Sequence, residues 1–550
     1  MKKEKKASIT KMEASSQKKN VLRWILIILL TAYYIILAVE PIRLTTQDFG
    51  RHIKNGEVIV SNLGDLSTIK RCLTANFYSF AYPDYPFVNH HWLSGVIFYL
   101  VSVFSGFGGV SILYYLLCLV SILIFFRVAE KEGSLSIAFA AAILIMPLIA
   151  ARREIRPEVF GYIFFALFVW IISAWERGSI SRRWLWLLPV ITVIWVNCHI
   201  SFIFGPLFVA LVFFEKLIGI KGINIEKKSH SPRQDERVAS RAQLKMLGIT
   251  FAASIGAACI NPFFIRGLFF PFLIFREYGH KIIENQSIVF LTKRGIVHAD
   301  FLAFKFLIAI LAVCFLLLLI TNRKKISLRW FLLSIIFGSM AFFAIRHLAL
   351  FGLVAIPALA HTIKSLHKEK SLFLSRSLLV LICLALAAAW MLTYSRYLTA
   401  RVQGIHFGLP QEQNTPAEFI KEHHIHGPFF NNYDIGSYLI YHFFPEEKVF
   451  VDNRPEAYPV PFFQNDYIPM QESNDIWQRM LDRYKFQAIV FQYNDVTRYA
   501  QQFLTLRIND PAWVPVFAQH EVIVFVPRTP EYAELIKKYE IPREYFSNLP

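Results

Sequence analysis

The chain has 550 residues, of which 55% are hydrophobic and only 18% are charged, and its formal net charge is +19. Soluble domains carry about 25% charged residues and lack repeated apolar runs of about 18 residues or more. The composition therefore excludes a series of ordinary soluble domains, and it predicts a polytopic membrane protein with a soluble appendage.

The positive charge is distributed in a way that excludes a nucleic-acid partner. Six polar segments hold 29 Lys and Arg against 10 Asp and Glu, which accounts for the whole excess: residues 1–24, 127–134, 176–183, 215–245, 321–329 and 361–376. One consistent topology places all six in the cytoplasm, as the positive-inside rule requires. A nucleic-acid surface would instead gather its charge on one folded face with aromatic residues between.

The apolar runs predict about eleven transmembrane helices. They lie at residues 21–39, 108–126, 135–150, 159–175, 184–198, 201–214, 246–260, 301–320, 330–344, 348–362 and 377–395. Two further apolar stretches, His91–Phe104 and Phe263–Phe275, are expected to lie as helices at the outer interface, since an extra crossing would move the later basic loops outside. Residues 1–20 form a basic cytoplasmic tail, and residues 21–395 form the membrane domain with its first outer loop at 40–107.

Residues 396–550 are expected to form an extracytoplasmic α/β domain, because an odd number of spans leaves the C-terminal region outside. Its apolar runs are only as long as strands: Val449–Val451, Ala488–Phe491 and Val522–Val526. Helical patterns at Thr415–His424 and Asn474–Tyr484 alternate with them. The expected location is the inner (plasma) membrane.

Charged residues in the first outer loop are the first candidates for chemistry. Asp48 is followed one helical turn later by Arg51 and His52, so all three can share a helix face. A carboxylate held beside cationic groups can act as a general base or a metal ligand next to a phosphate leaving group. His90 and His91 open an amphipathic helix and can bind a phosphate. The alternatives are a charged interfacial loop and an aromatic belt with polar tips.

A second group of charges follows the third span, in the turn Ala151–Glu158. Arginine on the outer side runs against the positive-inside rule, and a lipid phosphate bound by Arg153 and Arg156 would explain it. Pairing of these arginines with Glu154 or Glu158 is the structural alternative. Other ionisable residues lie at the outer ends of separate spans, where such charges favour a shared polar cavity: His199, Arg346 and His347.

Three more candidates lie further along the chain. Glu284, in the third outer loop, either completes a site or is solvated. Tyr433 and Asp434 form a turn, and Asp452 with Asn453 follows a predicted strand, which is a common place for a ligand contact. A loop capped by Asx turns is the alternative for both segments.

In their order, these features resemble the GT-C superfamily of multi-pass glycosyltransferases, which take a sugar from a polyprenyl-phosphate carrier. The matching features are the Asp48 loop, the Pro83–Trp92 stretch, the Arg153–Glu158 turn and an outer C-terminal domain. Residues 432–436 (Asn-Tyr-Asp-Ile-Gly) and Asp452-Asn453 are similar to motifs of oligosaccharyltransferase catalytic subunits, and Glu284 is similar to their mobile-loop glutamate. Asn432 and Tyr433 stand where that family has two tryptophans.

The resemblance implies a GT-C-like fold and a role for each candidate. Asp48 would be the catalytic base or a ligand of a divalent cation, Mg²⁺ or Mn²⁺, with assistance from Glu154 or Glu158. The implied substrate-binding residues are Arg51, His52, His90, His91, Arg153, Arg156, His199, Glu284, Arg346, His347, Tyr433, Asp434, Asp452 and Asn453.

The implied function is transfer of a sugar from a polyprenyl-phosphate-linked donor to a glycan, lipid or protein acceptor at the outer face of the membrane. The carrier's prenyl chain would lie along apolar helix faces, beside the membrane lipids. Three other functions remain open: a flippase or transporter of lipid-linked sugars, transfer of an oligosaccharide to protein, and a scaffold that binds through its outer domain.

Overall fold

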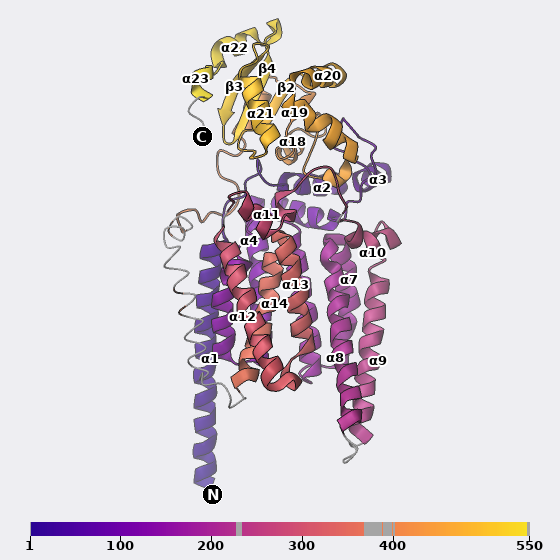
Figure 1. Cartoon of the computed structure of the whole chain (residues 1–550), viewed down its shortest axis with the longest axis vertical. Coiled ribbons are helices and arrows are strands. Elements are labelled where there is room, and N and C mark those ends of the chain that lie inside the picture. The colour runs from indigo at the N-terminus through magenta and orange to yellow at the C-terminus, as the bar shows by residue number, and fades with distance from the viewer. Residues whose placement is uncertain are drawn as a thin grey trace.

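The computed structural model describes residues 2–226, 234–274, 276–296, 298–367, 385, 388, 399 and 402–546. A helical bundle forms most of the molecule, and a small C-terminal domain with a sheet is seated on one end of it (Figure 1). The N-terminus lies beyond the opposite end of the bundle. The architecture is therefore the predicted one, a helical membrane domain with an α/β domain at its C-terminus.

The bundle consists of long, apolar helices. They are α1 (Lys2–Ala38), α4 (Trp92–Glu132), α5 (Leu135–Ile149), α6 (Glu158–Glu176), α7 (Leu187–Cys198), α8 (Phe204–Glu226), α9 (Gln234–Ala257), α12 (Ala299–Asn322), α13 (Leu328–Phe343) and α14 (Leu348–His367). Six helical segments within the described ranges are long and apolar enough to cross a membrane. The chain is thus an integral membrane protein, and eleven crossings remain a prediction. The predicted span at 377–395 lies almost wholly outside the described residues.

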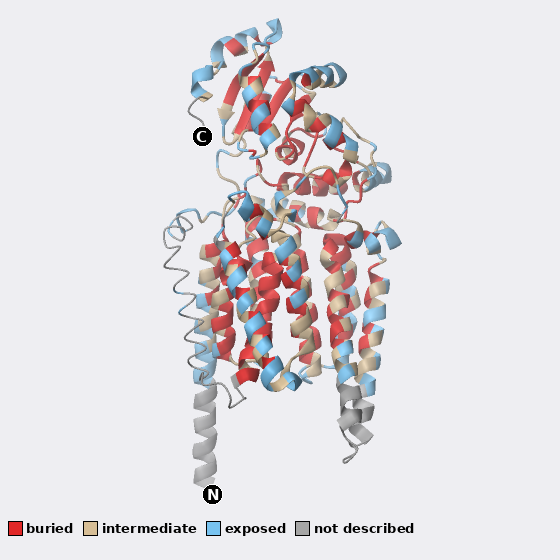
Figure 2. Ribbon diagram, viewed as in Figure 1, coloured by how far each residue is buried: buried red, intermediate tan, exposed pale blue. Residues whose placement is uncertain are grey.

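Burial in the bundle fits a hydrocarbon surrounding. Large apolar side chains such as Trp24, Ile28 and Phe306 are more than half exposed on the outside of the bundle, whereas most of α14 is buried (Figure 2). In water such a surface would cost free energy, because exposing apolar area is unfavourable. In lipid it carries no such cost.

Short helices lie between the bundle and the C-terminal domain (Figure 1): α2 (Phe49–Ser61), α3 (Leu66–Thr74), α10 (Phe264–Leu273) and α11 (Ile288–Lys293). The predicted helix at His91–Phe104 and the predicted span at 108–126 are joined as α4, which breaks at Gly106. Gly106 has φ 62°, a left-handed conformation that favours glycine. The break lets the two halves of α4 take different directions.

Helix α2 is held from two sides by close packing. A Cβ atom at Gly56 would lie 2.2 Å from the carbonyl oxygen of Gly95 in α4, and one at Gly50 would lie 2.8 Å from that of Ser437. The Arg51 backbone N–H also donates to Ser437 Oγ at 2.9 Å. Both contacts need the small residue, so glycines fix α2, and Asp48 just before it, against the bundle and the C-terminal domain.

The C-terminal domain contains a four-stranded sheet in the order β1-β2-β4-β3. Its elements are α17 (Thr415–Glu422), β1 (Phe429–Asn431), α18 (Gly436–Phe443), α19 (Pro469–Glu472), α20 (Asn474–Tyr484), β2 (Ala488–Gln492), α21 (Arg498–Ile508), β3 (Trp513–Gln519), β4 (Val522–Pro527), α22 (Ala533–Tyr539) and α23 (Arg543–Phe546). Strands β1 and β2 are parallel, while β4 is antiparallel to both β2 and β3. The strands predicted at Ala488 and Val522 and the helices predicted near Thr415 and Asn474 are confirmed.

The strand predicted at Val449–Val451 is wrong. This segment makes a single bridge, from Val449 to Ser79 in the loop between α3 and α4. The Val449 N–H donates to the Tyr78 carbonyl at 3.0 Å, and the Phe80 N–H donates to the Val449 carbonyl at 3.0 Å. The apolar run is buried because it ties that loop to the C-terminal domain rather than because it joins the sheet.

Candidate active site

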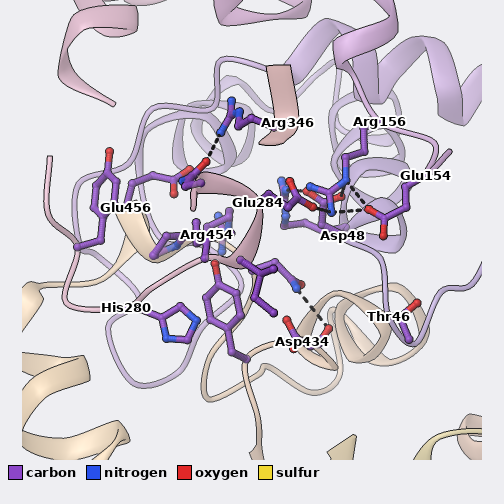
Figure 3. A pocket seen from close by; sticks show the side chains of 18 of the residues that line it. Thr46, Asp48, Glu154, Arg156, His280, Glu284, Arg346, Asp434, Arg454 and Glu456 are labelled. Carbon is purple, nitrogen blue, oxygen red and sulfur yellow. Dashed lines mark hydrogen bonds and ion pairs between the residues drawn. The ribbon is translucent and has the colours of Figure 1, made fainter. Parts of the chain in front are cut away.

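A cavity of about 480 Å³ lies between the bundle and the C-terminal domain (Figure 3). It brings together segments far apart in the sequence: the start of α2, the turn before α6, the segment between α10 and α11, and loops of the C-terminal domain. Most candidates from the sequence line it, namely Asp48, Arg51, His52, His90, His91, Glu154, Arg156, Glu158, His199, Glu284, Arg346, Tyr433, Asp434 and Asn453. Arg153, His347 and Asp452 do not line it.

Asp48 precedes α2 as its N-cap residue, but its side chain makes no capping hydrogen bond. Its Oδ2 lies 3.4 Å from Arg51 Nη2 and 3.5 Å from His52 Nε2, and its Oδ1 lies 3.7 Å from Arg156 Nε. Burial alone would raise the pKa of Asp48, but Arg156, His52 and Arg51 outweigh burial and hold the pKa well below its usual range. Asp48 is therefore a carboxylate at neutral pH. Its buried Oδ1 has no hydrogen-bond partner among the described residues.

Two arginines and three glutamates form a network beside Asp48. Arg152 makes a two-pronged contact with Glu158, with both N–O distances at 3.0 Å, and also reaches Glu284 at 2.9 Å. Arg156 Nη2 lies 2.7 Å from Glu154 and 2.6 Å from Glu284. The alternative of mutual pairing within the turn thus holds for Arg156 with Glu154, and Arg152 was not among the predicted residues.

The network constrains the protonation of its carboxyls. Burial acts to raise the pKa of Glu284, but Arg152 and Arg156 reverse the shift and lower the pKa below its usual value. Glu154 differs, because burial, with Glu284 nearby, raises its pKa despite the contact with Arg156. Through its contacts with Arg152 and Arg156, Glu284 joins the segment after α10 to the turn before α6.

Four histidines line one side of the cavity. Ring centroids are 3.8 Å apart for His90 and His91, 5.2 Å for His91 and His199, and 5.4 Å for His52 and His91. Burial lowers the pKa of all four, to about 4 for His52 and His199 and well below the usual value for the other two. They are therefore uncharged at pH 7, and they offer hydrogen bonds to a ligand rather than positive charge.

The carboxylates do not fit the divalent cation that the sequence resemblance implies. Such an ion needs several oxygen atoms about 2.1 Å from one point for Mg²⁺, or about 2.3–2.6 Å for Ca²⁺. Glu154 and Glu284 instead converge on the guanidinium of Arg156, and Glu158 on that of Arg152. Within the described ranges, no group of three or more His, Cys, Asp or Glu side chains is placed to hold a metal. No step below passes through one.

Arg346 stands apart from the network. Its Nη1 donates to Asn285 Oδ1 at 3.0 Å, and no carboxylate lies within ion-pair distance of it in the part of the chain that the structure describes. It lines both the charged cavity and a second cavity of about 500 Å³. The second cavity is largely apolar and includes Phe204, Phe272, Phe343 and Leu350, with His347 among its polar residues. The two cavities meet at Glu158, His199, Ile274, Tyr278, His280, Lys281, Ile282, Asn285 and Arg346.

Two of the predicted residues lie outside the charged cavity and are paired with other side chains. Arg153 points toward Asp300, with Nη2 4.0 Å from its carboxylate. Asp452 is fully buried and accepts from Arg454 Nη2 at 2.6 Å and from the Tyr458 hydroxyl at 3.2 Å. Asp452 thus holds Arg454, which lines the cavity in its place.

The C-terminal domain supplies a different wall of the cavity. The ends of the parallel strands β1 and β2 lead into it through Tyr433 and Asp434 and through Gln492, Asp495 and Thr497. This is the crevice where parallel sheets commonly bind ligands. Burial, with Asp495 and then Glu154 and Glu284 nearby, raises the pKa of Asp434 to about 7.

Several oxygen atoms on this wall have no partner. Gln492 Oε1, Thr497 Oγ1 and Asn453 Oδ1 are buried without a hydrogen bond from any described residue. Sequence reasoning missed Gln492, Asp495 and Thr497, since a Gln-Tyr-Asn-Asp-Val-Thr segment has no pattern that separates it from an ordinary loop. The only sequence signal near these residues was the predicted strand ending at Phe491.

Comparison with solved structures identifies the fold. The chain matches the archaeal oligosaccharyltransferase AglB from Archaeoglobus fulgidus, in complex with an inhibitory peptide and a dolichol-phosphate, with a TM-score of 0.56 at 13% identity, over 93% of this chain and 75% of AglB. It matches the apo form of the A. fulgidus enzyme with a TM-score of 0.56 at 12% identity, over 90% and 73% of the two chains. The chain therefore shares its fold with this oligosaccharyltransferase.

A more distant GT-C match is ArnT from Cupriavidus metallidurans bound to undecaprenyl phosphate, with a TM-score of 0.45 at 12% identity, over 94% of this chain and 99% of ArnT. No protein-family model and no curated protein sequence matches the chain. The likeness to AglB is thus one of structure.

Proposed function

We propose that the protein is a membrane glycosyltransferase that moves a sugar from a polyprenyl-phosphate-linked donor to an acceptor. The observation that carries this proposal is the meeting of two cavities at Arg346. One holds an ionised carboxylate, Asp48, and the other is largely apolar. A polyprenyl-phosphate sugar has a polar sugar, an anionic phosphate and an apolar prenyl chain in that order. The charged cavity, Arg346 and the largely apolar cavity follow one another in the same order. The fold shared with AglB supports the same reading.

Asp48 serves as the catalytic base in this proposal. The acceptor hydroxyl donates to Asp48 Oδ1, which accepts no hydrogen bond from any described residue. The acceptor oxygen forms a bond to the anomeric carbon, the bond from that carbon to the phosphate oxygen breaks, and the acceptor proton passes to Asp48. The phosphate leaves with the electron pair. General-base assistance of this kind contributes about 10²–10⁴-fold in rate.

Arg346 and Lys281 are the cations at the junction of the two cavities, and we place the donor phosphate at Arg346. The guanidiniums of Arg152 and Arg156 are already paired with glutamates, whereas Arg346 donates to the neutral Asn285 and has no ion pair among the described residues. A guanidinium binds phosphate oxygens through two parallel N–H groups and favours the charge that builds on the leaving group. The apolar cavity beyond Arg346 would hold the first part of the prenyl chain.

The acceptor is proposed to bind at the C-terminal wall. Gln492, Thr497 and Asn453 present unpaired oxygen atoms there, and Asp434 presents a carboxyl. The Gln492 and Asn453 oxygens accept hydrogen bonds and the Thr497 hydroxyl both donates and accepts, so this surface suits a ligand that carries donors and acceptors together. Hydroxyl groups of a glycan fit this requirement. A glycan is therefore our preferred acceptor among glycan, lipid and protein.

The orientation in the membrane is part of the same proposal. The basic segments at 1–24, 127–134 and 321–329 belong to the end of the bundle away from the C-terminal domain, where α1 begins and where the α4–α5 and α12–α13 connections lie (Figure 1). By the positive-inside rule, the N-terminus then lies on the cytoplasmic side of the plasma (inner) membrane and the cavity lies on the outer side. Cysteine labelling from outside the cell at the exposed residue Val496 tests it, with modification expected there.

Purified protein in lipid vesicles tests the function. We expect release of radiolabelled sugar from at least one member of a panel of polyprenyl-phosphate sugars when a glycan acceptor is present. Movement of the labelled lipid across the vesicle membrane without transfer would assign the protein as a flippase. Transfer to a peptide but never to a glycan would assign it as an oligosaccharyltransferase-like enzyme and contradict the acceptor proposed here.

A further inference from the structure

The centre of the charged network is a guanidinium rather than an open space. Arg156 is partly buried in the loop before α6, and its Nη2 lies 2.7 Å from Glu154 Oε2 and 2.6 Å from Glu284 Oε1. Its Nε lies 3.7 Å from Asp48 Oδ1. Three carboxylates from three separate segments of the chain thus surround one positive charge. Figure 3 shows Glu154, Asp48 and Glu284 around Arg156.

The position of Arg156 Nη2 is close to one that a divalent cation would occupy. Oxygen ligands of Ca²⁺ lie at about 2.3–2.6 Å. The two glutamate oxygens already lie at 2.6 and 2.7 Å from that nitrogen. A cation and a guanidinium therefore compete for the same place, and the guanidinium, which belongs to the chain, is always present.

Arg156 also keeps its charge in this setting. Burial acts to lower its pKa, but Asp48, Glu284 and Glu154 more than compensate and raise the pKa above its already high usual value. Holding three partly buried carboxylates together without a compensating charge would cost free energy, so a permanent cation at this point stabilises the site.

We propose that Arg156 takes the place of a divalent cation in this site, holding Asp48, Glu154 and Glu284 around a built-in positive charge. The role in transfer rests on the function proposed above, whereas the exclusion of metal is a property of the folded protein alone. The wild-type site is accordingly closed to Mn²⁺ and Ca²⁺, and transfer needs neither ion.

Replacing Arg156 should open the site to metal. Arg156→Ala removes the guanidinium and leaves three carboxylates around the vacated volume. We expect this variant to bind Ca²⁺ or Mn²⁺ at least about tenfold more tightly than wild type, since a pair of buried like charges gains strongly from a cation. Its melting temperature should fall in chelator and rise again when Ca²⁺ is added, because a ligand that binds only the folded state stabilises it.

The binding measurement uses detergent-purified full chain, titrated with Ca²⁺ in a calorimeter and with Mn²⁺ by electron paramagnetic resonance. Arg153→Ala is the matched control: it removes an arginine from the same turn, but one that points to Asp300 outside the cavity. This control should bind no more metal than wild type. The double variant Arg156→Ala/Glu284→Gln should lose the metal that Arg156→Ala gains, which locates the ion.

Two results would overturn the proposal. One is a stoichiometric Mn²⁺ ion in wild type that Asp48→Asn removes, since metal and Arg156 would then coexist. The other is a folded Arg156→Ala that binds no metal. Should that variant fail to fold, Arg156→Gln keeps more of the volume without the charge and is titrated in the same way. Absence of sugar transfer by wild type would defeat the proposed function but leave these metal titrations fully interpretable.

Discussion

The two walls of the charged cavity differ in which of their polar groups are paired. On the bundle side, Glu158 and Glu284 each contact an arginine at 3.0 Å or less, so these ion pairs form without a ligand, while Asp48 Oδ1 and His52 Nδ1 have no hydrogen-bond partner among the described residues. On the C-terminal side, Gln492 and Thr497 are buried with oxygen atoms that have no partner. Such ion pairs keep reacting groups in a fixed geometry, whereas an unsatisfied surface gains hydrogen bonds only when a ligand arrives. This difference agrees with our proposal that the bundle wall carries the chemistry and the C-terminal wall, the recognition wall, binds the acceptor.

Removal of the base should have the largest effect. Asp48→Asn keeps the size of the side chain but cannot accept the acceptor proton, so we expect kcat to fall on the order of 10³-fold while affinity for the carrier phosphate stays within about twofold. Steady-state kinetics beside carrier binding measures both. Asp84→Asn is the control, since Asp84 lies in the same loop region, largely exposed and paired only with Arg71. Equal activity of Asp48→Asn and wild type would remove chemistry from the bundle wall.

Loss of the unpaired cation should come next. Arg346→Gln removes the charge that faces the donor phosphate, and we expect kcat/KM for the donor to fall about 10²-fold, as for other losses of a group that stabilises a leaving charge. Arg346→Lys should retain part of the activity, because it restores charge without the two-pronged geometry. The matched control is Arg294→Gln, whose guanidinium stacks on Phe290 at 4.8 Å outside both cavities. A similar loss in that control would show a general effect of surface charge.

Changes on the recognition wall should be smaller and should fall on the acceptor alone. Gln492→Ala removes an unpaired oxygen, and a hydrogen bond lost to the acceptor corresponds to about a tenfold rise in its KM. The KM for the donor should not change. Kinetics with each substrate varied in turn separates the two effects. Gln487→Ala serves as the control, since Gln487 is exposed and lies just before the same strand. A rise in the donor KM instead would place the donor sugar at this wall.

The sequence was sufficient for the class of fold and for one side of the site. Hydrophobic runs predicted the bundle and the C-terminal α/β domain, and the order of charged loops led to Asp48 and the turn before α6. It did not show that Glu284 contacts both Arg152 and Arg156, because that contact joins residues more than 100 positions apart. Nor did it reveal Gln492 and Thr497, whose role depends on where the end of β2 meets the bundle.

The same limits explain the misplaced candidates. Asp452 follows an apolar run, which suggested a strand end facing a ligand, but the run is buried against the loop at Ser79 and the carboxylate pairs with Arg454. Local pattern cannot distinguish a strand from a segment that is apolar because another loop covers it. The sequence pattern supports Arg153 and Arg156 equally as site residues. Only the structure shows that Arg156 points into the cavity and Arg153 toward Asp300.

The smallest expected effect concerns the pH dependence of stability on the recognition wall. Asp434 faces Asp495, Glu154 and Glu284, with Arg156 as the opposing charge, and its pKa is raised to about 7 in the folded chain. A raised pKa means that the folded state binds the proton more tightly than the unfolded state. The stabilisation from this protonated carboxyl is therefore fully present below the pKa of Asp in the unfolded chain, about 4, and it is lost as the pH rises toward 7. Asp434→Asn cannot ionise and escapes the loss. Its melting temperature relative to wild type should therefore increase from pH 5 to pH 8, by on the order of 2 °C, in thermal scans of the detergent-solubilised chain. A difference that stays constant across this range would mean that Asp434 is not the titrating group on the recognition wall.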